Sequence, residues 1–494
     1  MIHVNTFAKR LWMILLASAF AITASAQFLR TSYLQDVPYS LQLNPAQVPS
    51  HGYINPILGP LNVTMQTNVF GVKDVTDMFS KDGDYFMSQE FIDKLESENK
   101  VNLNLSWDQV SFGWFDDLNF FSFNIGTRVD AGSILPKSLF EFMRTMNGDI
   151  NADFWKQAQR QNMSGGKAAM LGYQEIGFGY ARKISDKLTV GAKFKVLLGA
   201  SHLDLEIKEL SAETPGIDMD KIQAIAAGYN LDWSKLNSQS DIQNLDPAIR
   251  NEIKGQAEIK VNATAKATMG GLEWEYATDK YGQESYINDV KMNGFKFSGW
   301  GLGLDLGATY EVMDNLEVTG AITDLGFINW GKSNSKIVSS NVHKTYDLSN
   351  DEDLIEFANM VSSKDILNYD MLQMKESDGD GYTTSLYTNL TLGGQYTLND
   401  KLVFGALYTG HFSKPRTVSE LTLSAAYNLS TWANFALSYS MIQSGGKSMG
   451  LGLRLGALYI GTDYMYFGNS SSCLNALIGL SIPLNKGKSF NSVD

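Results

Sequence analysis

Cysteine is nearly absent from the sequence. Of 494 residues, only Cys473 carries a thiol, and an internal disulfide would need two. A catalytic thiol needs a neighbouring base and a site that lowers its pKa, and the residues next to Cys473 in the sequence supply neither. We therefore expect Cys473 to pack at the start of a strand.

Positive charge and histidine are also scarce. Lys and Arg total 40 against 53 Asp and Glu, which gives a net charge of -13 at pH 7. Such an acidic chain argues against nucleic acid as a partner. The five histidines lack the spacing of metal ligands, and no nucleophile elbow or serine–lysine motif occurs. We expect no enzyme activity, catalytic residue, metal or cofactor, although distant residues could still converge into an active site.

Long apolar runs are missing as well. Residues 1–26 have the three parts of a signal peptide: the basic pair Lys9-Arg10, the apolar stretch Leu11–Ile22 and the small residues Ala24-Ser25-Ala26. Beyond them, no stretch has the roughly 18 consecutive apolar residues of a membrane helix. We predict export, with the mature chain starting at Gln27. In a membrane, such a chain would have to form a closed sheet, because lipid offers backbone groups no water.

The dominant pattern in the sequence is a period of two between residues 382 and 484. Apolar residues fill alternate positions, and Gly, Ser, Thr, Asn and Gln fill the positions between them. The first such face comprises Leu386, Thr388, Leu390, Leu392, Gly394, Tyr396 and Leu398. Side chains of a β-strand alternate between two faces, and long strands that are apolar outside and polar inside are typical of transmembrane barrels.

Earlier strands are predicted at 61–70, 101–113, 118–130, 171–184, 188–208, 255–272, 299–312 and 316–327. Similar short turns join pairs of strands, at Ile184–Leu188, Val312–Leu316, Leu398–Leu402, Leu429–Ala433 and, more faintly, Trp114–Leu118. We predict an all-β fold, a transmembrane antiparallel up-and-down barrel. Since bacterial barrels have even numbers of strands, we choose fourteen, within a range of 12 to 16.

The long links, at 71–100, 131–170, 209–254 and 328–381, show helical spacing instead. One stripe comprises Ile242, Leu245, Ile249 and Ile253, and another Leu354, Ile355, Phe357, Ala358 and Val361. These helices either pack on each other above the barrel or fold inward and constrict the lumen.

The mature chain divides into three parts. Residues 27–60 are rich in Pro, Asn, Gln and Ser, and form either a plug that folds into the lumen or a disordered leader. Residues 61–484 form the barrel, and 485–494 form a polar tail.

Several motif matches fail on physical grounds. Gly326–Ser333 fits the phosphate-loop pattern, but its interior holds Phe, Ile and Trp and no apolar helix follows. Ser377–Gly381 resembles part of a calcium loop but lacks the third acidic ligand and the closing Glu. Gly299, Gly301, Gly303 and Gly307 share the polar face of one strand, where we expect them to leave space in the lumen.

Three features carry a family resemblance: Leu43-Asn44-Pro45-Ala46, the Asn-Asp-Lys-Leu turns, and the run Thr323–Trp330. They resemble a Bacteroidetes family of outer-membrane barrels of unknown function. That family is similar to long-chain fatty-acid transporter barrels and to a type IX secretion barrel. The resemblance implies fourteen strands and an N-terminal segment that plugs the lumen. It also marks Asn44, Pro45, Ala46, Asp324, Gly326 and Trp330 as structural positions.

These observations leave two leading hypotheses. The first is a barrel of the outer membrane, in contact with its lipid, that passes or binds small hydrophobic molecules. The alternative is a closed barrel that acts as a surface scaffold or secretion-system component for exported proteins. An outer-membrane enzyme is a third hypothesis, for which the sequence offers no constellation of residues.

Overall fold

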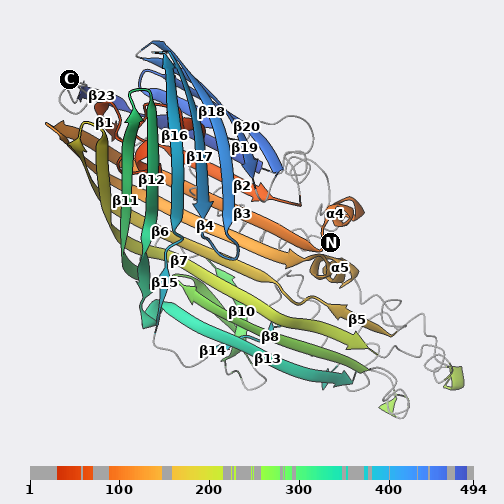
Figure 1. Cartoon of the computed structure of the whole chain (residues 1–494). Coiled ribbons are helices and arrows are strands. Elements are labelled where there is room, and N and C mark those ends of the chain that lie inside the picture. The colour runs from red at the N-terminus through yellow and green to blue at the C-terminus, as the bar shows by residue number, and fades with distance from the viewer. Residues whose placement is uncertain are drawn as a thin grey trace.

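A computed structural model gives the fold of the chain (Figure 1). It describes residues 30–56, 59–69, 88–146, 158–214, 258–278, 284–291, 296–347, 372–376, 381–399, 401–430, 432–442, 446–463 and 473–486, with a few isolated positions between them. The predicted signal peptide, most of both helical stripes and residues Ser377–Asp380 of the calcium-like motif lie outside the described residues.

Fourteen strands close into an antiparallel ring, as the sequence predicted. Three of them are interrupted, so each combines two segments. In ring order the wall comprises β1 (His51–Pro56) with β2 (Leu61–Thr67), β3 (Glu98–Asp116), β4 (Asn119–Pro136), β6 (Lys167–Ser185), β7 (Leu188–Thr214), β11 (Gly299–Met313), β12 (Leu316–Trp330), β15 (Tyr382–Ser385) with β16 (Asn389–Asn399), β17 (Leu402–His411), β18 (Val418–Ser430), β19 (Ala433–Ile442), β20 (Gly446–Leu455), β21 (Leu458–Thr462), and β22 (Cys473–Leu480) with β23 (Ile482–Lys486).

The first and last wall strands pair with each other and close the ring. β1 pairs with β23, and β2 pairs with β22. β1 lies within the range 27–60 that the sequence assigned to the N-terminal segment, so the wall begins at His51. Each predicted short turn joins two neighbouring strands, as in the β6–β7 and β11–β12 hairpins. Because strand direction alternates around the ring, these turns all lie at one end of the barrel.

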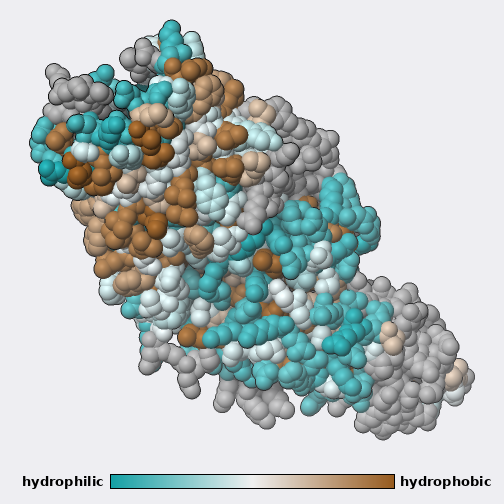
Figure 2. Space-filling model, viewed as in Figure 1, coloured by the Kyte–Doolittle hydropathy of each residue, from teal (hydrophilic) through white to brown (hydrophobic). Residues whose placement is uncertain are grey.

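The outer face of the wall is apolar. Figure 2 shows hydrophobic residues gathered over the barrel and hydrophilic residues over the part of the molecule that extends beyond it. On β11, Trp300, Leu302, Leu304, Leu306 and Tyr310 are all exposed. Such a surface suits contact with lipid, and the closed sheet satisfies its backbone hydrogen bonds internally. The fold is therefore that of a transmembrane barrel. The aromatic residues Tyr396, Tyr427 and Trp432 are also exposed.

The described helices are short, and none of them forms part of the wall. They are η1 (Arg30–Leu34), α2 (Ser40–Leu43), α4 (Gln89–Lys94), α5 (Lys137–Met146) and η4 (Lys332–Asn334). None of the helices in the described part of the chain is long and apolar enough to cross a membrane.

β7 continues beyond the ring and supports a second, smaller sheet. Its first half pairs with β11, and its second half, from His202 onward, pairs with β8 (Glu258–Gly270). β8 in turn pairs with β13 (Ser335–Asp347), and the short strands β5 (Gln159–Asn162) and β14 (Lys375–Glu376) flank this sheet. The prediction that the 255–272 strand forms part of the barrel wall is therefore wrong. The cause is the length of β7, which offers its edge to two successive partners.

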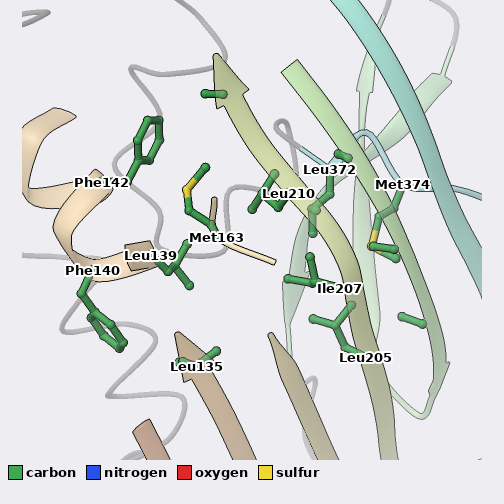
Figure 3. Packing of buried hydrophobic residues seen from close by; sticks show 14 of the residues in the cluster. Leu135, Leu139, Phe140, Phe142, Met163, Leu205, Ile207, Leu210, Leu372 and Met374 are labelled. Atoms are coloured by element: carbon green, nitrogen blue, oxygen red, sulfur yellow. The ribbon is translucent and has the colours of Figure 1, made fainter. Parts of the chain in front are cut away.

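This extension has its own hydrophobic core. Alternate residues of β8 point into the core, including Ile259, Val261 and Met269. Helices α4 and α5 cover this face together with the hairpin of β9 (Glu273–Thr278) and β10 (Glu284–Lys291). Figure 3 shows α5 beside distal β7, the half of β7 that begins at His202. Phe91 and Phe140 join the two helices edge to face, with ring centroids 5.9 Å apart. These two helices thus pack on the extension, above the barrel.

Trp330 lies at the branch point, where the pairing partner of β7 changes from β11 to β8. Its side chain is fully buried, and Nε1 donates to Thr384 Oγ1 at 2.9 Å. A Cβ on Gly199, Gly270 or Gly299 would lie only 2.8, 2.6 or 3.1 Å from the indole ring. The three glycines, one from each strand that meets here, therefore provide the space that the tryptophan occupies.

A β-bulge at Asp324 reverses the two faces of β12. Asp324 has a φ of 59°, and the β11–β12 register shifts beside it. Val318 and Ile322 are exposed before the bulge, whereas Leu325 and Phe327 are exposed after it. One extra residue exchanges the inner and outer faces of a strand, so Trp330 points inward.

The strand paired with β12 is broken at the same level, between Ser385 and Asn389. Leu386 is 4% exposed inside the barrel. The sequence placed it on the outer face, and that prediction is wrong because residues 386–388 leave the strand. Leu392 and Leu398, further along β16, do face outward.

We expect Trp330→Ala to destabilise the barrel by about 3–5 kcal/mol, because the change leaves a large cavity at the branch point. The readout is the temperature at which the folded band disappears in heat-modifiable gel electrophoresis. Trp300→Ala is the matched control, since Trp300 is 57% exposed on the outer face. An equal effect of both substitutions would contradict the role given to Trp330.

Candidate functional site in the barrel lumen

The N-terminal segment, residues 30–50, lies against inward-facing residues of the wall. It comprises η1, α2 and the connecting chain, and nearly all of its residues are buried or half-buried. Tyr33 and Leu34 pack on Leu407 and Ala426 of β17 and β18, while Leu41 packs near Phe120 of β4. The segment therefore contacts wall strands that are far apart around the ring.

Arg30 attaches the start of this segment to two carboxylates. Its guanidinium pairs with Glu420 of β18 and with Asp463, which follows β21, at 3.2 Å in the second case. Asp463 also accepts hydrogen bonds from the backbone N–H groups of Arg30 and Thr31, both at 2.8 Å. All three charged side chains are nearly inaccessible to solvent, where a charge-assisted hydrogen bond contributes most.

Asn44, Pro45 and Ala46 form a turn that presses on two wall glycines. Asn44 Oδ1 accepts from the Ala46 N–H at 2.8 Å, and Asn44 Nδ2 donates to the carbonyl of Ala308 at 3.1 Å. A Cβ on Gly307 would lie 2.0 Å from Asn44 Oδ1, and one on Gly191 would lie 2.4 Å from the Pro45 carbonyl carbon. Gly307 does face inward as predicted, but the turn occupies the space beside it.

The buried phenol of Tyr33 lies near enough to Glu317 of β12 for the carboxylate to affect it. Burial raises the pKa of the Tyr33 phenol, and the Glu317 carboxylate raises it further. The phenol is therefore neutral at any physiological pH.

A network of buried charges links neighbouring strands on the inner face of the wall. Arg128 of β4 bonds to Asp108 of β3 at 2.6 Å and lies 3.4 Å from Glu175 of β6. Lys193 of β7 bonds to Glu175 at 2.6 Å. Gln42 of the N-terminal segment donates to Asp108 at 2.8 Å and so connects the segment to this network.

Lys195 extends the network to the bulge in β12. Its ammonium group lies 2.8 Å from Asp305 and 2.7 Å from Asp324. The Asp324 N–H also donates to Asp305 at 2.7 Å. The bulge thus turns a carboxylate and an N–H group toward the same cluster.

His411 closes the network across the lumen. Its Nδ1 lies 2.6 Å from Asn389 Oδ1, and its Nε2 lies 3.0 Å from Asp130 Oδ1 of β4. Asn389 donates its amide N–H to Asp324 at 2.8 Å, which orients its oxygen toward the histidine. Both ring nitrogens therefore contact side-chain oxygens, one on each side of the lumen.

The loop after β17 folds over this bridge. A Cβ on Gly132 of β4 would lie 2.8 Å from the Pro415 ring. Lys414 pairs with Asp204 on distal β7. This short link constricts the lumen, a role that the sequence considered only for the long helical links.

The lumen cavities lined by described residues are separate from one another. A cavity of about 320 Å³ lies between the N-terminal segment and the turn end of the wall, where Lys187, Glu311 and Glu317 line it. Two narrow cavities lie further in and share Asp130 and His411 in their walls. The His411–Asp130 bridge therefore separates them.

An apolar cluster adjoins the charged cavity at the interruption of the wall. It contains Leu171, Tyr173, Leu197, Ile328, Trp330, Leu386 and Tyr387, and Tyr173 and Tyr387 also line the charged cavity. Apolar side chains thus meet charged ones at the level where β15 ends and β16 begins.

Two of the remaining histidines and the phosphate-loop pattern lie in the wall, on the extension and at the end of β12. No group of three or more potential metal ligands occurs among the residues the structure describes. His202 contacts Tyr382 in the wall at 2.9 Å, and His343 contacts Asn262 on the extension at 2.8 Å. The phosphate-loop pattern coincides with the end of β12 and with η4, a single turn.

The sequence matches the model of a family of unknown function, DUF5723, over residues 45–463. The chain belongs to this family. No curated protein matches it.

Several solved structures are similar to the chain. The P. putida toluene transporter TodX is 11% identical, with a TM-score of 0.40, and the match covers 91% of this chain and 94% of that chain. A Pseudomonas aeruginosa FadL homologue is 12% identical, with a TM-score of 0.39, and the match covers 93% of this chain and 95% of that chain. The translocator domain of the autotransporter NalP from Neisseria meningitidis is 9% identical, with a TM-score of 0.27, and the match covers 86% of this chain and 88% of that chain. Likeness at this level carries no argument about function.

In this member of the family, the six residues marked by the resemblance separate into two groups. Asn44, Pro45 and Ala46 contact the wall at Gly191 and Gly307, whereas Asp324, Gly326 and Trp330 lie along the bulged half of β12. A Cβ on Gly326 would lie 2.3 Å from the carbonyl oxygen of Leu302. Sequence reasoning missed Arg30, the charged network and His411. Charged residues at inward positions of strands, such as Lys193 and Lys195, were the available signal.

We expect Gly307→Ala to displace the N-terminal segment, because the added methyl group would overlap Asn44. The readout is trypsin cleavage after Arg30 in the folded, detergent-solubilised protein, which should be slow in the parent and fast in the variant. Gly320→Ala on the same hairpin is the control, since its Cβ meets no atom closer than 3.4 Å. Continued protection of Arg30 in Gly307→Ala would show that the turn does not depend on this contact.

Proposed function

We propose that the protein is an outer-membrane barrel that passes or binds small hydrophobic molecules, and that its N-terminal segment closes the lumen until it is displaced. The apolar outer face and the predicted signal peptide support this location. The polar attachments of the segment support its release, because water can replace hydrogen bonds such as that from Gln42 to Asp108.

The observation that carries the proposal is the apolar cluster at the interruption of the wall. Ligand sites for small molecules are mostly apolar, with a few polar groups that orient the ligand. Leu386 and Tyr387 point inward where the wall strand is broken, and Tyr173 connects the cluster to the charged cavity.

Uptake of N-phenylnaphthylamine, a hydrophobic dye that intact outer membranes exclude, tests the proposal. Cells that produce the Gly307→Ala form, in which the segment is displaced, should take up the dye faster than cells with an empty vector. Adding Leu386→Asn to this form should return the rate to background, because it places an amide in the apolar cluster. Adding Leu398→Asn, on the outer face at the turn end, should leave the rate unchanged. Background uptake by cells with a correctly folded Gly307→Ala form would overturn the proposal.

The extension favours a second candidate, a closed barrel that serves as a surface scaffold or secretion-system component. This part has a core of its own and a polar outer face with Ser339, Asn341 and His343 exposed on β13. A photo-crosslinking residue at Asn341 should then capture an exported protein in living cells, whereas one at Leu398 should not. Equal labelling at both positions would remove the support for a scaffold.

A further inference from the structure

Carboxylates outnumber cations in the charged network and at the Arg30 attachment. Seven carboxylates lie there against four permanent cations. The carboxylates are Asp108, Asp130, Glu175, Asp305, Asp324, Glu420 and Asp463, and the cations are Arg30, Arg128, Lys193 and Lys195. This part of the lumen therefore carries an excess of negative side chains.

One of the four cations belongs to the segment that fills the lumen. Arg30 neutralises Glu420 and Asp463, which are fixed to the wall. Displacement of the segment would remove Arg30 and leave both carboxylates behind. These seven carboxylates would then face three permanent cations. The segment also takes Asp36 away from Arg454 at the turn end, so opening makes the region around Glu420 and Asp463 more negative.

We propose that the opened lumen selects against anions, so that neutral and cationic molecules pass while amphiphiles bearing a carboxylate or phosphate are excluded. Rings of Asp and Glu favour cations in pores, and walls of low dielectric strengthen that field. The selectivity depends mainly on Glu420 and Asp463, the two carboxylates that opening deprives of Arg30. This inference rests on the proposed function, since it requires that the lumen can open.

Reversal potential in a KCl gradient across a planar bilayer tests the selectivity. Two opened forms are measured: Gly307→Ala in the full mature chain, and a variant that lacks residues 27–49 but keeps β1 intact. Folding of each is checked by heat-modifiable electrophoresis. Both should conduct, with a reversal potential that favours K⁺ over Cl⁻ several-fold.

Neutralisation of the two carboxylates then tests their role. E420Q/D463N in the opened forms should remove most of the preference for K⁺ over Cl⁻. If the double variant does not fold, the single variants E420Q and D463N are measured instead. E206Q/E213Q is the matched control, because it removes two exposed carboxylates from distal β7, beyond the ring.

The outcomes separate the two proposals. If both opened forms are folded and neither conducts, the proposed passage fails. If they conduct without preference, or prefer Cl⁻, the selectivity inference is overturned while the passage stands. If the K⁺ preference survives E420Q/D463N, or falls equally in E206Q/E213Q, the assignment to Glu420 and Asp463 is wrong.

Discussion

Compensation of buried carboxylates is the constraint on which the interior of this barrel depends. A carboxylate removed from water is costly unless cations and hydrogen-bond donors surround it. Glu175 is fully buried and meets this requirement through Arg128, Lys193 and Lys195, which come from two neighbouring strands. Because each ion pair joins different strands, the network also fixes the relative register of the wall.

The same requirement explains the bulge at Asp324. Without it, β12 would continue with Leu325 facing inward, toward Lys195. The extra residue instead brings the Asp324 carboxylate to Lys195 and directs its N–H to Asp305. The strained backbone at a φ of 59° is offset by a charge-assisted hydrogen bond and by the return of Leu325 to the lipid face.

Local periodicity predicted the wall because lipid and lumen impose a strict alternation of side chains. The same pattern also indicates the bulge, because the outward apolar residues have even numbers up to Ile322 and odd numbers from Leu325 onward. The prediction nevertheless treated the two stretches as one regular strand. The fate of the 255–272 strand was harder to foresee. It alternates like a wall strand, yet one face packs against helices instead of lipid. The length of β7 was the usable signal, because a transmembrane strand needs only about 9–11 residues.

Pairings across the lumen could not be predicted from the sequence. Arg30 and Glu420 are separated by most of the chain, and His411 meets Asp130 only because β17 and β4 lie on opposite sides of the ring. No local pattern encodes that relation, which exists once the ring has closed with a particular strand number. The inward phase of each strand identifies which charges share the lumen. Closure of the ring then decides which of them meet.

We propose that closure of the ring and plugging of the lumen are coupled. The N-terminal segment supplies groups that the wall lacks: a guanidinium for Glu420 and Asp463, and an amide for Asp108. A wall without this segment would hold the same carboxylates with fewer partners, and water would have to solvate them. On this proposal, the residues that stabilise the closed state determine the charge of the open state once the segment leaves.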